Sequence, residues 1–183
     1  MRWFWIDRYT EFVAGQHATA IKNVSLAEDH LHDHFPGAPV MPNSLVLEGM
    51  AQTAGLLVAQ NSEFEREVVL AKVAKAEFHF LARPGDTLVY RAKIEDFKEG
   101  GAFTVITSHV DDRLQGEAEI FFAHLDRGAS APRMFEPEAI HAWLQSLRMF
   151  EVARDAAGNP LSNAKLLAAC HAASHQNGAN SRS

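Results

Sequence analysis

The fold is decided by residues 34–60, which read HFPGAPVMPNSLVLEGMAQTAGLLVAQ. From Leu45 onward this stretch is apolar on nearly every side. Before its end it is interrupted by only three polar residues, which are Glu48, Gln52 and Thr53. A surface helix shows one polar face, so the pattern predicts a helix over residues 45–60 that is buried all round.

The start and the width of this helix can also be predicted. Asn43 and Ser44 precede it and are good N-cap residues, because their side-chain oxygens can accept from free main-chain N–H groups. Small residues keep the helix thin, so that other backbone can approach it closely. These residues are Gly49, Ala51, Ala54 and Gly55.

Strand patterns lie on both sides of the helix. Aromatic, β-branched and alternating residues predict strands over residues 3–12, 18–24, 68–80, 87–97, 103–110 and 115–125. Short polar turns separate the later strands, which predicts consecutive hairpins and an antiparallel sheet. One thin buried helix beside such a sheet predicts an α+β fold, with a curved antiparallel sheet wrapped around a long central helix.

The composition shifts at about residue 126. Residues 128–132, GASAP, read as a linker, and a helix is expected to begin at Pro137. A second short helix is expected over 162–173 and a disordered tail over 176–183. We therefore expect a core domain over 1–127 that carries the chemistry, and a C-terminal helical appendage over 128–183 that is dispensable for it.

Composition and charge exclude several classes of protein. The 183 residues carry a net charge of −6 with scattered Lys and Arg, which argues against a nucleic-acid or anionic-membrane partner. No apolar run approaches the roughly 18 residues of a membrane span, and the apolar stretch at the N-terminus is too short for a signal peptide. Cys170, the one cysteine, cannot form an internal disulfide. We expect a cytoplasmic protein.

His34 lies in the segment 28–42, where three prolines and a glycine predict an irregular but stiff loop. Histidine is the most frequent general base near neutral pH, so His34 is a candidate for that role. The alternative is a loop histidine that is hydrogen-bonded to a nearby backbone carbonyl.

Glu48 is a candidate general acid. It lies about one turn into the apolar helix, and helical side chains tilt toward the N-terminus, so its carboxyl group should point back at the helix start. A carboxyl group desolvated in this way should have a raised pKa, which suits proton donation. The alternative is that Glu48 reaches solvent or pairs with a cation.

The helix start supplies a third component. Main-chain N–H groups near Asn43 and Ser44 have no partner within the helix, so they can hold a carbonyl oxygen that gains negative charge. A base, an acid and oxyanion donors within one segment indicate proton abstraction beside a carbonyl, followed by loss of a group.

A divalent metal site is a competing interpretation of the histidines in this loop. His30 and His32 at i and i+2 of an extended stretch would point the same way, with Asp33 beside them. The sequence offers no clear third ligand at a telling spacing. We therefore expect no metal, and solvated loop histidines instead.

The motif resembles a known family. His34-Phe35-Pro36-Gly37, Pro39-Val40-Met41-Pro42, Glu48 and Met50-Ala51-Gln52 are similar to the signature of the hot-dog-fold 3-hydroxyacyl-[acyl-carrier-protein] dehydratases, the FabZ and FabA enzymes of type II fatty-acid synthesis. The similarity includes the 14-residue interval from His34 to Glu48, and weaker similarity runs over residues 3–125. Glu48 is typical of the FabZ branch, whereas Pro39 to Pro42 looks as much like FabA.

This resemblance implies a fold, a reaction and partners. The family has the hot-dog fold and forms homodimers, often arranged as trimers of dimers, with an acyl tunnel at the subunit interface. Its reaction removes water from a (3R)-3-hydroxyacyl thioester to give the trans-2-enoyl thioester, without a cofactor. The substrate is carried on the phosphopantetheine of acyl carrier protein.

The resemblance also implies residue roles. His34 takes the C2 proton, Glu48 assists departure of the C3 hydroxyl, and the N–H at Asn43 holds the thioester carbonyl. Asn43 stands where the family has glycine; its main-chain donor survives that change, but its side chain enters the site. Further substrate-binding residues are Gly37 and Ser44, and the acyl tunnel is expected to be lined by Phe35, Met41, Leu45 and Gln52.

Two other functions stay open. A hot-dog thioesterase would position water to attack the carbonyl, instead of aiming a base at C2. A non-catalytic acyl-thioester binding module should tolerate the loss of His34 and Glu48, which an enzyme should not.

Overall fold

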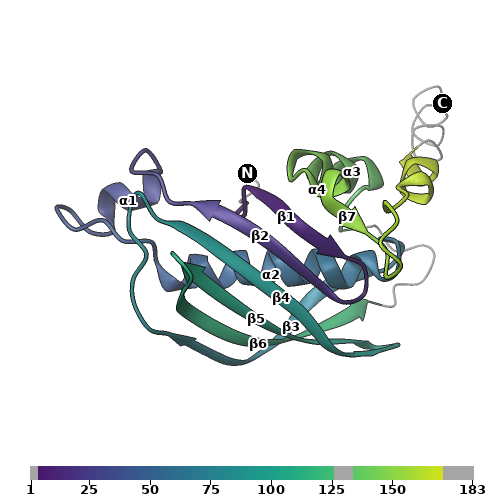
Figure 1. Cartoon of the computed structure of the whole chain (residues 1–183), viewed down its shortest axis with the longest axis horizontal. Helices are drawn as coiled ribbons and strands as arrows, with labels where there is room; N and C mark the ends of the chain where they lie inside the picture. Colours follow the sequence, from purple (N-terminus) through teal and green to yellow (C-terminus); the bar gives the residue numbers. More distant parts are fainter. Residues whose placement is uncertain (1–3, 126–133, 171–183) are drawn as a thin grey trace, which may run out of the picture.

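A seven-stranded sheet curves around one long helix in the computed structural model, which describes residues 4–125 and 134–170 (Figure 1). The strand order is β3-β6-β5-β4-β2-β1-β7. The strands are β1 (Arg8–Val13), β2 (His17–Asn23), β3 (Glu67–Phe78), β4 (Thr87–Lys98), β5 (Gly101–Val110), β6 (Arg113–Leu125) and β7 (Ala153–Arg154). Neighbours from β3 to β1 pair antiparallel, and β7 is parallel to β1. The predicted α+β hot-dog architecture is confirmed.

The central helix α2 (Asn43–Gln60) packs its apolar residues against the inner face of the sheet. Burial there needs a close approach, which Gly49 allows. A Cβ atom at Gly49 would lie 2.6 Å from the carbonyl oxygen of Trp5 and 2.6 Å from the ring of Tyr90. Any larger side chain at this position would push α2 away from both neighbours.

Two expectations for α2 are wrong. The helix begins at Asn43 with Pro42 as its N-cap residue, so Asn43 and Ser44 lie in the first turn and are not caps. The helix is also not buried all round, because Ser44 and Glu48 are exposed. An apolar pattern shows that a helix needs a cover, but does not show whether that cover comes from the same chain.

The expected hairpins are present. Strand β3 is the predicted long, bulged strand, with register shifts against β6 between Leu70 and Lys72 and between Val73 and Lys75. It lies at the end of the strand order, so its outer edge is not paired within the described chain.

The segment before His34 differs from the expected irregular loop. It contains a short helix, α1 (Asp29–Asp33), whose Leu31 is buried in the core. The prolines that predicted irregular structure begin only at Pro36, so they leave the residues upstream free to form a helical turn.

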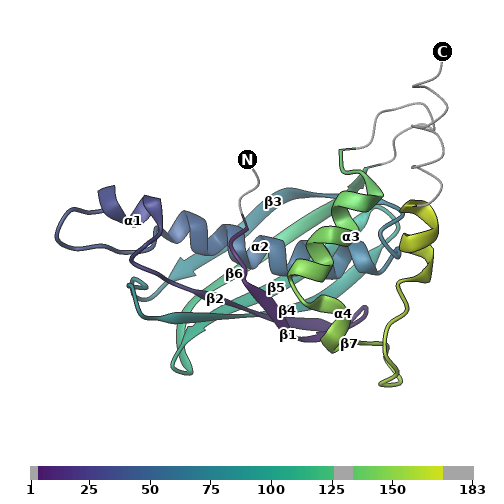
Figure 2. The ribbon, with the colours of Figure 1, turned by 90° about the horizontal axis from the view of Figure 1, so that it is seen from above.

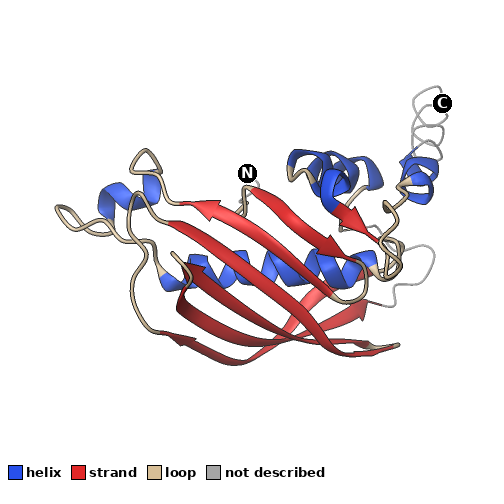
Figure 3. Ribbon diagram, in the orientation of Figure 1, coloured by secondary structure: helices blue, strands red, loops and turns tan. Residues whose placement is uncertain are grey.

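The C-terminal extension adds α3 (Pro137–Ser146), α4 (Met149–Val152), strand β7 and a helical turn over 164–170 (Figures 2 and 3). The predicted helix at Pro137 is confirmed; α4 and β7 were not predicted. The extension buries Leu144, Leu147, Met149 and Ala153 in the same core as the sheet and α2. The predicted linker over 128–132, the tail over 176–183 and residues 171–173 lie outside the described residues.

Main-chain hydrogen bonds fasten the extension to β1. The N–H of Tyr9 donates to the carbonyl oxygen of Leu147, and the N–H of Ala14 donates to that of Arg154, each at 2.9 Å. The edge of β1 is therefore occupied by the extension. Over residues 4–125 and 134–170, no helix is both long enough and apolar enough to cross a membrane.

Candidate active site

His34 is held in a defined tautomer by the loop that follows it. Its Nδ1 lies 3.0 Å from the carbonyl oxygen of Val40, and the N–H of Val40 donates to the carbonyl oxygen of His34 at 2.9 Å. A carbonyl oxygen can only accept, so Nδ1 carries the hydrogen and Nε2 keeps its lone pair. The half-buried ring thus presents Nε2 as its basic atom.

The loop from His34 to Pro42 is fixed by short-range contacts. The N–H of Ala38 donates to the carbonyl oxygen of Phe35 at 2.9 Å, across a turn in which Gly37 has φ +76°. That left-handed conformation favours glycine. At the far end the N–H of Met41 donates to the carbonyl oxygen of Ala82 at 2.9 Å. The loop therefore ties His34 to Val40, three residues before α2 begins.

The start of α2 offers free donors. The N–H groups of Leu45 and Val46 both donate to the carbonyl oxygen of Pro42, whereas those of Asn43 and Ser44 have no main-chain acceptor among the described residues. In addition, the side-chain Oδ1 of Asn43 is buried without a hydrogen-bond partner in the described part of the chain. This first turn can receive a ligand oxygen at its N–H groups and a ligand donor at Oδ1.

Glu48 is exposed and points to a partner on its own helix. The side-chain Nε2 of Gln52 donates to Oε1 of Glu48 at 2.9 Å, and Oε1 of Gln52 accepts from the main-chain N–H of Trp5 at 2.9 Å. The expectation that α2 alone desolvates this carboxyl group is therefore wrong for the single chain. Sequence reasoning missed the Gln52 contact, although the i, i+4 spacing on a helix could have indicated it.

A base with a fixed tautomer, free helix N–H groups and a carboxyl group thus lie along 15 consecutive residues, from His34 to Glu48. Residues 3–119 match the family model described as the FabA-like domain. The chain belongs to the FabA-like family.

Curated relatives of this FabA-like chain, and solved structures of other proteins that resemble it, are consistent with its family and its fold. The chain is 37% identical over 126 residues to the 3-hydroxyacyl-[acyl-carrier-protein] dehydratase FabZ of Thiobacillus denitrificans, covering 67% of this chain and 87% of the relative. The dehydratase heterocomplex ApeI:P of Xenorhabdus doucetiae superposes with a TM-score of 0.50 at 19% identity, over 60% of this chain and 89% of that one. Protein smu.793 of Streptococcus mutans, solved bound to acetyl-CoA, superposes with a TM-score of 0.56 at 14% sequence identity. The match covers 68% of this chain and 93% of that one. These two structures support the hot-dog fold.

The expected tunnel residues occupy different environments in the FabA-like chain. Met41 is fully buried, Leu45 packs against the core, and Phe35 is 56% exposed. Gln52 is hydrogen-bonded to Glu48. The tunnel lining remains a prediction.

The histidines of α1 do not form the pair that a metal site would need. His30 and His32 lie on a helix, where residues at i and i+2 do not face each other. The ring of His30 instead packs edge-on against Trp5 with centroids 5.1 Å apart, and burial lowers the pKa of His30. Among the described residues, no three His, Cys, Asp or Glu side chains gather as a possible metal site.

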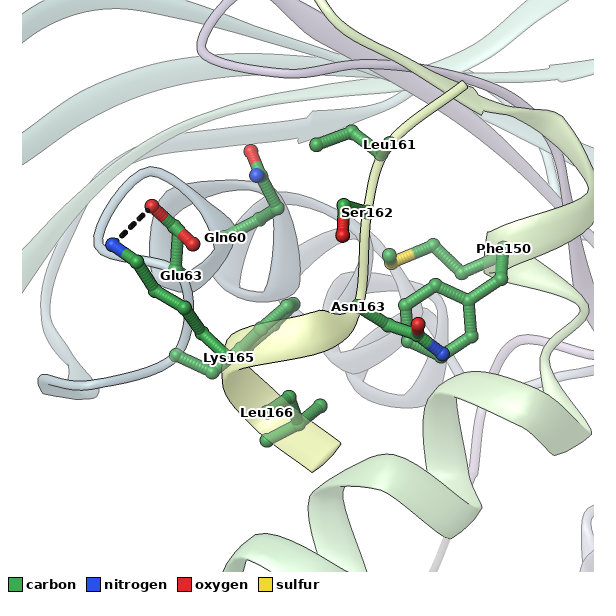
Figure 4. Close-up of a pocket in the computed structure, with 10 residues that line it drawn as sticks. Gln60, Glu63, Phe150, Leu161, Ser162, Asn163, Lys165 and Leu166 are labelled. Carbon is green, nitrogen blue, oxygen red and sulfur yellow. Dashed lines mark hydrogen bonds and ion pairs between the residues drawn. The ribbon is translucent and has the colours of Figure 1, made fainter. Parts of the chain in front are cut away.

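A cavity lies at the other end of α2, between Gln60 and the extension (Figure 4). It is bordered by Phe64, Phe150 and Leu166 and by the ion pair of Lys165 with Glu63 at 2.6 Å. Its volume of about 20 Å³ suffices for about one water molecule. It cannot hold an acyl chain and it is remote in the fold from His34.

Proposed function

We propose that this chain removes water from (3R)-3-hydroxyacyl thioesters carried on acyl carrier protein and releases trans-2-enoyl thioesters. The fixed tautomer of His34 carries the proposal, because it leaves Nε2 as the basic atom of the ring, in the same short segment that supplies the free N–H groups at the start of α2. The dehydratase names of the curated FabZ relatives support it.

The proposed reaction balances with two side chains. Nε2 of His34 takes the C2 proton while the N–H groups of Asn43 and Ser44 stabilise the charge on the thioester oxygen. The electron pair then forms the C2–C3 double bond, the C3–O bond breaks, and Glu48 gives its proton to the departing hydroxyl to form water. Return of a proton from His34 to Glu48 through solvent resets the site. The acid and the base both come from the chain, so no cofactor is needed beyond the phosphopantetheine of the substrate.

We further propose that the site is shared in a homodimer, with His34 of one protomer facing Glu48 of the partner subunit. Two observations support this. Glu48 is exposed and forms its hydrogen bond with Gln52, not with His34 of its own chain, and β3 presents an open sheet edge. Strand edges of this kind pair readily with a second copy. A trimer of such dimers is the larger assembly that the family resemblance implies.

One assay separates the candidate functions. The protein is incubated with 3-hydroxyacyl thioesters of several chain lengths, and enoyl absorbance and free thiol are followed in parallel. A dehydratase produces enoyl thioester with no free thiol, whereas a thioesterase releases thiol. Binding of the thioester without either product would support the acyl-binding module and contradict the proposed reaction.

Mixing two inactive variants tests the shared site. His34→Ala and Glu48→Ala proteins are co-expressed with different tags and the heterodimer is purified. If the site is shared, one site carries both changes and the other carries neither, so about half the wild-type activity returns, by counting one intact site of two. If each chain supplied its whole site, the heterodimer would be as inactive as its parents.

A further inference from the structure

Three aromatic side chains join the C-terminal extension to the segment that precedes β1. The rings of Phe135 and Trp143 meet edge to face with centroids 5.2 Å apart, and Trp143 meets Phe4 in the same way at 5.8 Å. Phe4 and Phe135 are partly exposed, so the contact holds the two segments together at the surface. We call Phe4, Phe135 and Trp143 the aromatic bridge.

Trp5, the residue next to this bridge, packs against α2. Trp5 follows Phe4 directly, and its carbonyl oxygen lies 2.6 Å from the position that a Cβ of Gly49 would take. Its N–H donates to Oε1 of Gln52 at 2.9 Å. Both main-chain polar groups of Trp5 therefore contact the part of α2 that carries Glu48.

The bond from Trp5 decides how Gln52 faces Glu48. A main-chain N–H can only donate, so the amide oxygen of Gln52 must face Trp5 and its NH₂ group must face the other way. That NH₂ group donates to Oε1 of Glu48 at 2.9 Å. Without the contact from Trp5, the side chain of Gln52 would lose a bond that holds it in place beside Glu48.

This contact leaves one oxygen of Glu48 for chemistry. Because Oε1 accepts a hydrogen bond, the proton that a general acid delivers is carried by Oε2. Glu48 is an exposed side chain, and such side chains lose little rotamer freedom unless a partner holds them. Gln52 supplies that partner.

We propose that the C-terminal extension positions Glu48 through a relay that runs from Trp143 to Phe4, Trp5 and Gln52. Trp143 is then a positioning residue of the active site, and the extension is not dispensable for chemistry as the sequence led us to expect. The assignment of Glu48 as the acid rests on the proposed function; the contacts of the relay do not.

Turnover is measured on full-length Trp143→Ala, with Trp143→Phe as the conservative variant and Phe150→Ala as the control. Phe150 is an aromatic residue of the extension that contacts His141 and is not part of the aromatic bridge. A misplaced catalytic group can lower the rate up to about 10²-fold, and we expect a loss on the order of 10-fold in kcat for Trp143→Ala with little change in KM. Trp143→Phe should keep the wild-type kcat, and so should Phe150→Ala. An equal loss in Trp143→Ala and Phe150→Ala would show general loosening and overturn the relay.

A double-mutant cycle tests whether the effect passes through Gln52. Gln52→Met keeps the size of the side chain and removes its hydrogen bonds to Trp5 and Glu48. In that background Trp143→Ala should cause no further loss of kcat, because the contact that it transmits is already gone. Losses that multiply in the double variant would contradict the relay.

Amide exchange tests the relay without relying on activity. The N–H of Trp5 should exchange faster with solvent deuterium in Trp143→Ala than in the wild type or in Phe150→Ala, because its orientation toward Gln52 is loosened. Unchanged exchange would refute the relay even if the protein were a dehydratase. If exchange is faster in Trp143→Ala but the wild-type protein has no dehydratase activity, the proposed function is refuted and the relay is kept.

Discussion

The motif segment, residues 34–52, and the extension, residues 134–170, both bury apolar side chains in the core, but they use their polar groups differently. In the motif segment, local hydrogen bonds fix the loop, while the carboxyl group of Glu48 stays exposed. In the extension, main-chain groups bond to β1 and so join the sheet.

This difference separates two kinds of sensitivity. A change to His34 or Glu48, neither of which is buried, removes a chemical group but little buried surface, so it should affect turnover more than stability. A change in the buried part of the extension removes packing, so it should affect stability first. The aromatic bridge is the one place where we expect a change in the extension to reach the chemistry.

The largest expected effect is on turnover. His34→Ala should lower kcat by about 10²–10⁴-fold, because the general base is lost. The free energy of unfolding, measured by chemical denaturation, should change little, since His34 is only half-buried. A folded His34→Ala protein with near-normal rates would end the assignment of the base.

The matching change in the extension is Met149→Ala. Met149 is 1% exposed, so its truncation should leave a cavity and lower the free energy of unfolding by about 2–5 kcal/mol. Measured well below the unfolding temperature, kcat should stay close to that of the wild type. Denaturation midpoints equal to the wild type would show that the extension does not share the core.

Gly49→Ala tests both regions together. Its new Cβ would lie 2.6 Å from Trp5 and from Tyr90, and such overpacking should lower the free energy of unfolding by about 1–3 kcal/mol. Because Trp5 also orients Gln52, kcat should fall as well. Gly55→Ala is the matched control on the same helix, since the nearest atoms to its Cβ would belong to the ring of Phe122, from 3.2 Å. Equal effects of the two changes on kcat would argue against the role of Trp5.

The smallest expected effect is on the pH dependence of stability. Burial lowers the pKa of His30 below its usual 6.5. As the pH falls below 6.5, the unfolded chain therefore binds a proton at His30 before the folded chain does. This contribution to stability is full at higher pH and is lost as the pH falls through 6.5 toward the folded-state pKa. His30→Gln should therefore flatten the acid side of a stability profile, and His32→Gln, at an exposed site, should leave it unchanged. Identical profiles for both variants would contradict this.

The sequence was sufficient for the parts of the fold that depend on local patterns. Strand alternation and hairpin turns predicted β1 to β6. The clustering of His34, Glu48 and the free N–H groups within one segment gives the candidate site, which stays a prediction. The short helix α1 departs from the expected loop because the prolines, which begin at Pro36, exclude helix only around and after themselves.

Long-range contacts were not predictable in the same way. Strand β7 pairs with β1 at Phe12 and Ala153, so the two partners lie far apart in the chain, and β7, with two residues, is too short to carry a pattern. The exposure of Glu48 was missed for a related reason, because an apolar helix face is the same in sequence whether its own sheet or a second copy covers it. The bond of Gln52 to Glu48 is local, so its i, i+4 spacing could have predicted it, unlike the long-range contacts.

The bonds from Leu147 and Arg154 to β1 bear on how many copies can associate through the sheet. Within the described residues the chain's own extension occupies the edge of β1, which leaves β3 as the long open edge at which strands can be added. Two copies joined there in a self-complementary way would use up both free edges at once, so the association would be finite and could not propagate into a filament. The extension would then prevent polymerisation. A chain that lacks it would have a second open strand edge, at β1.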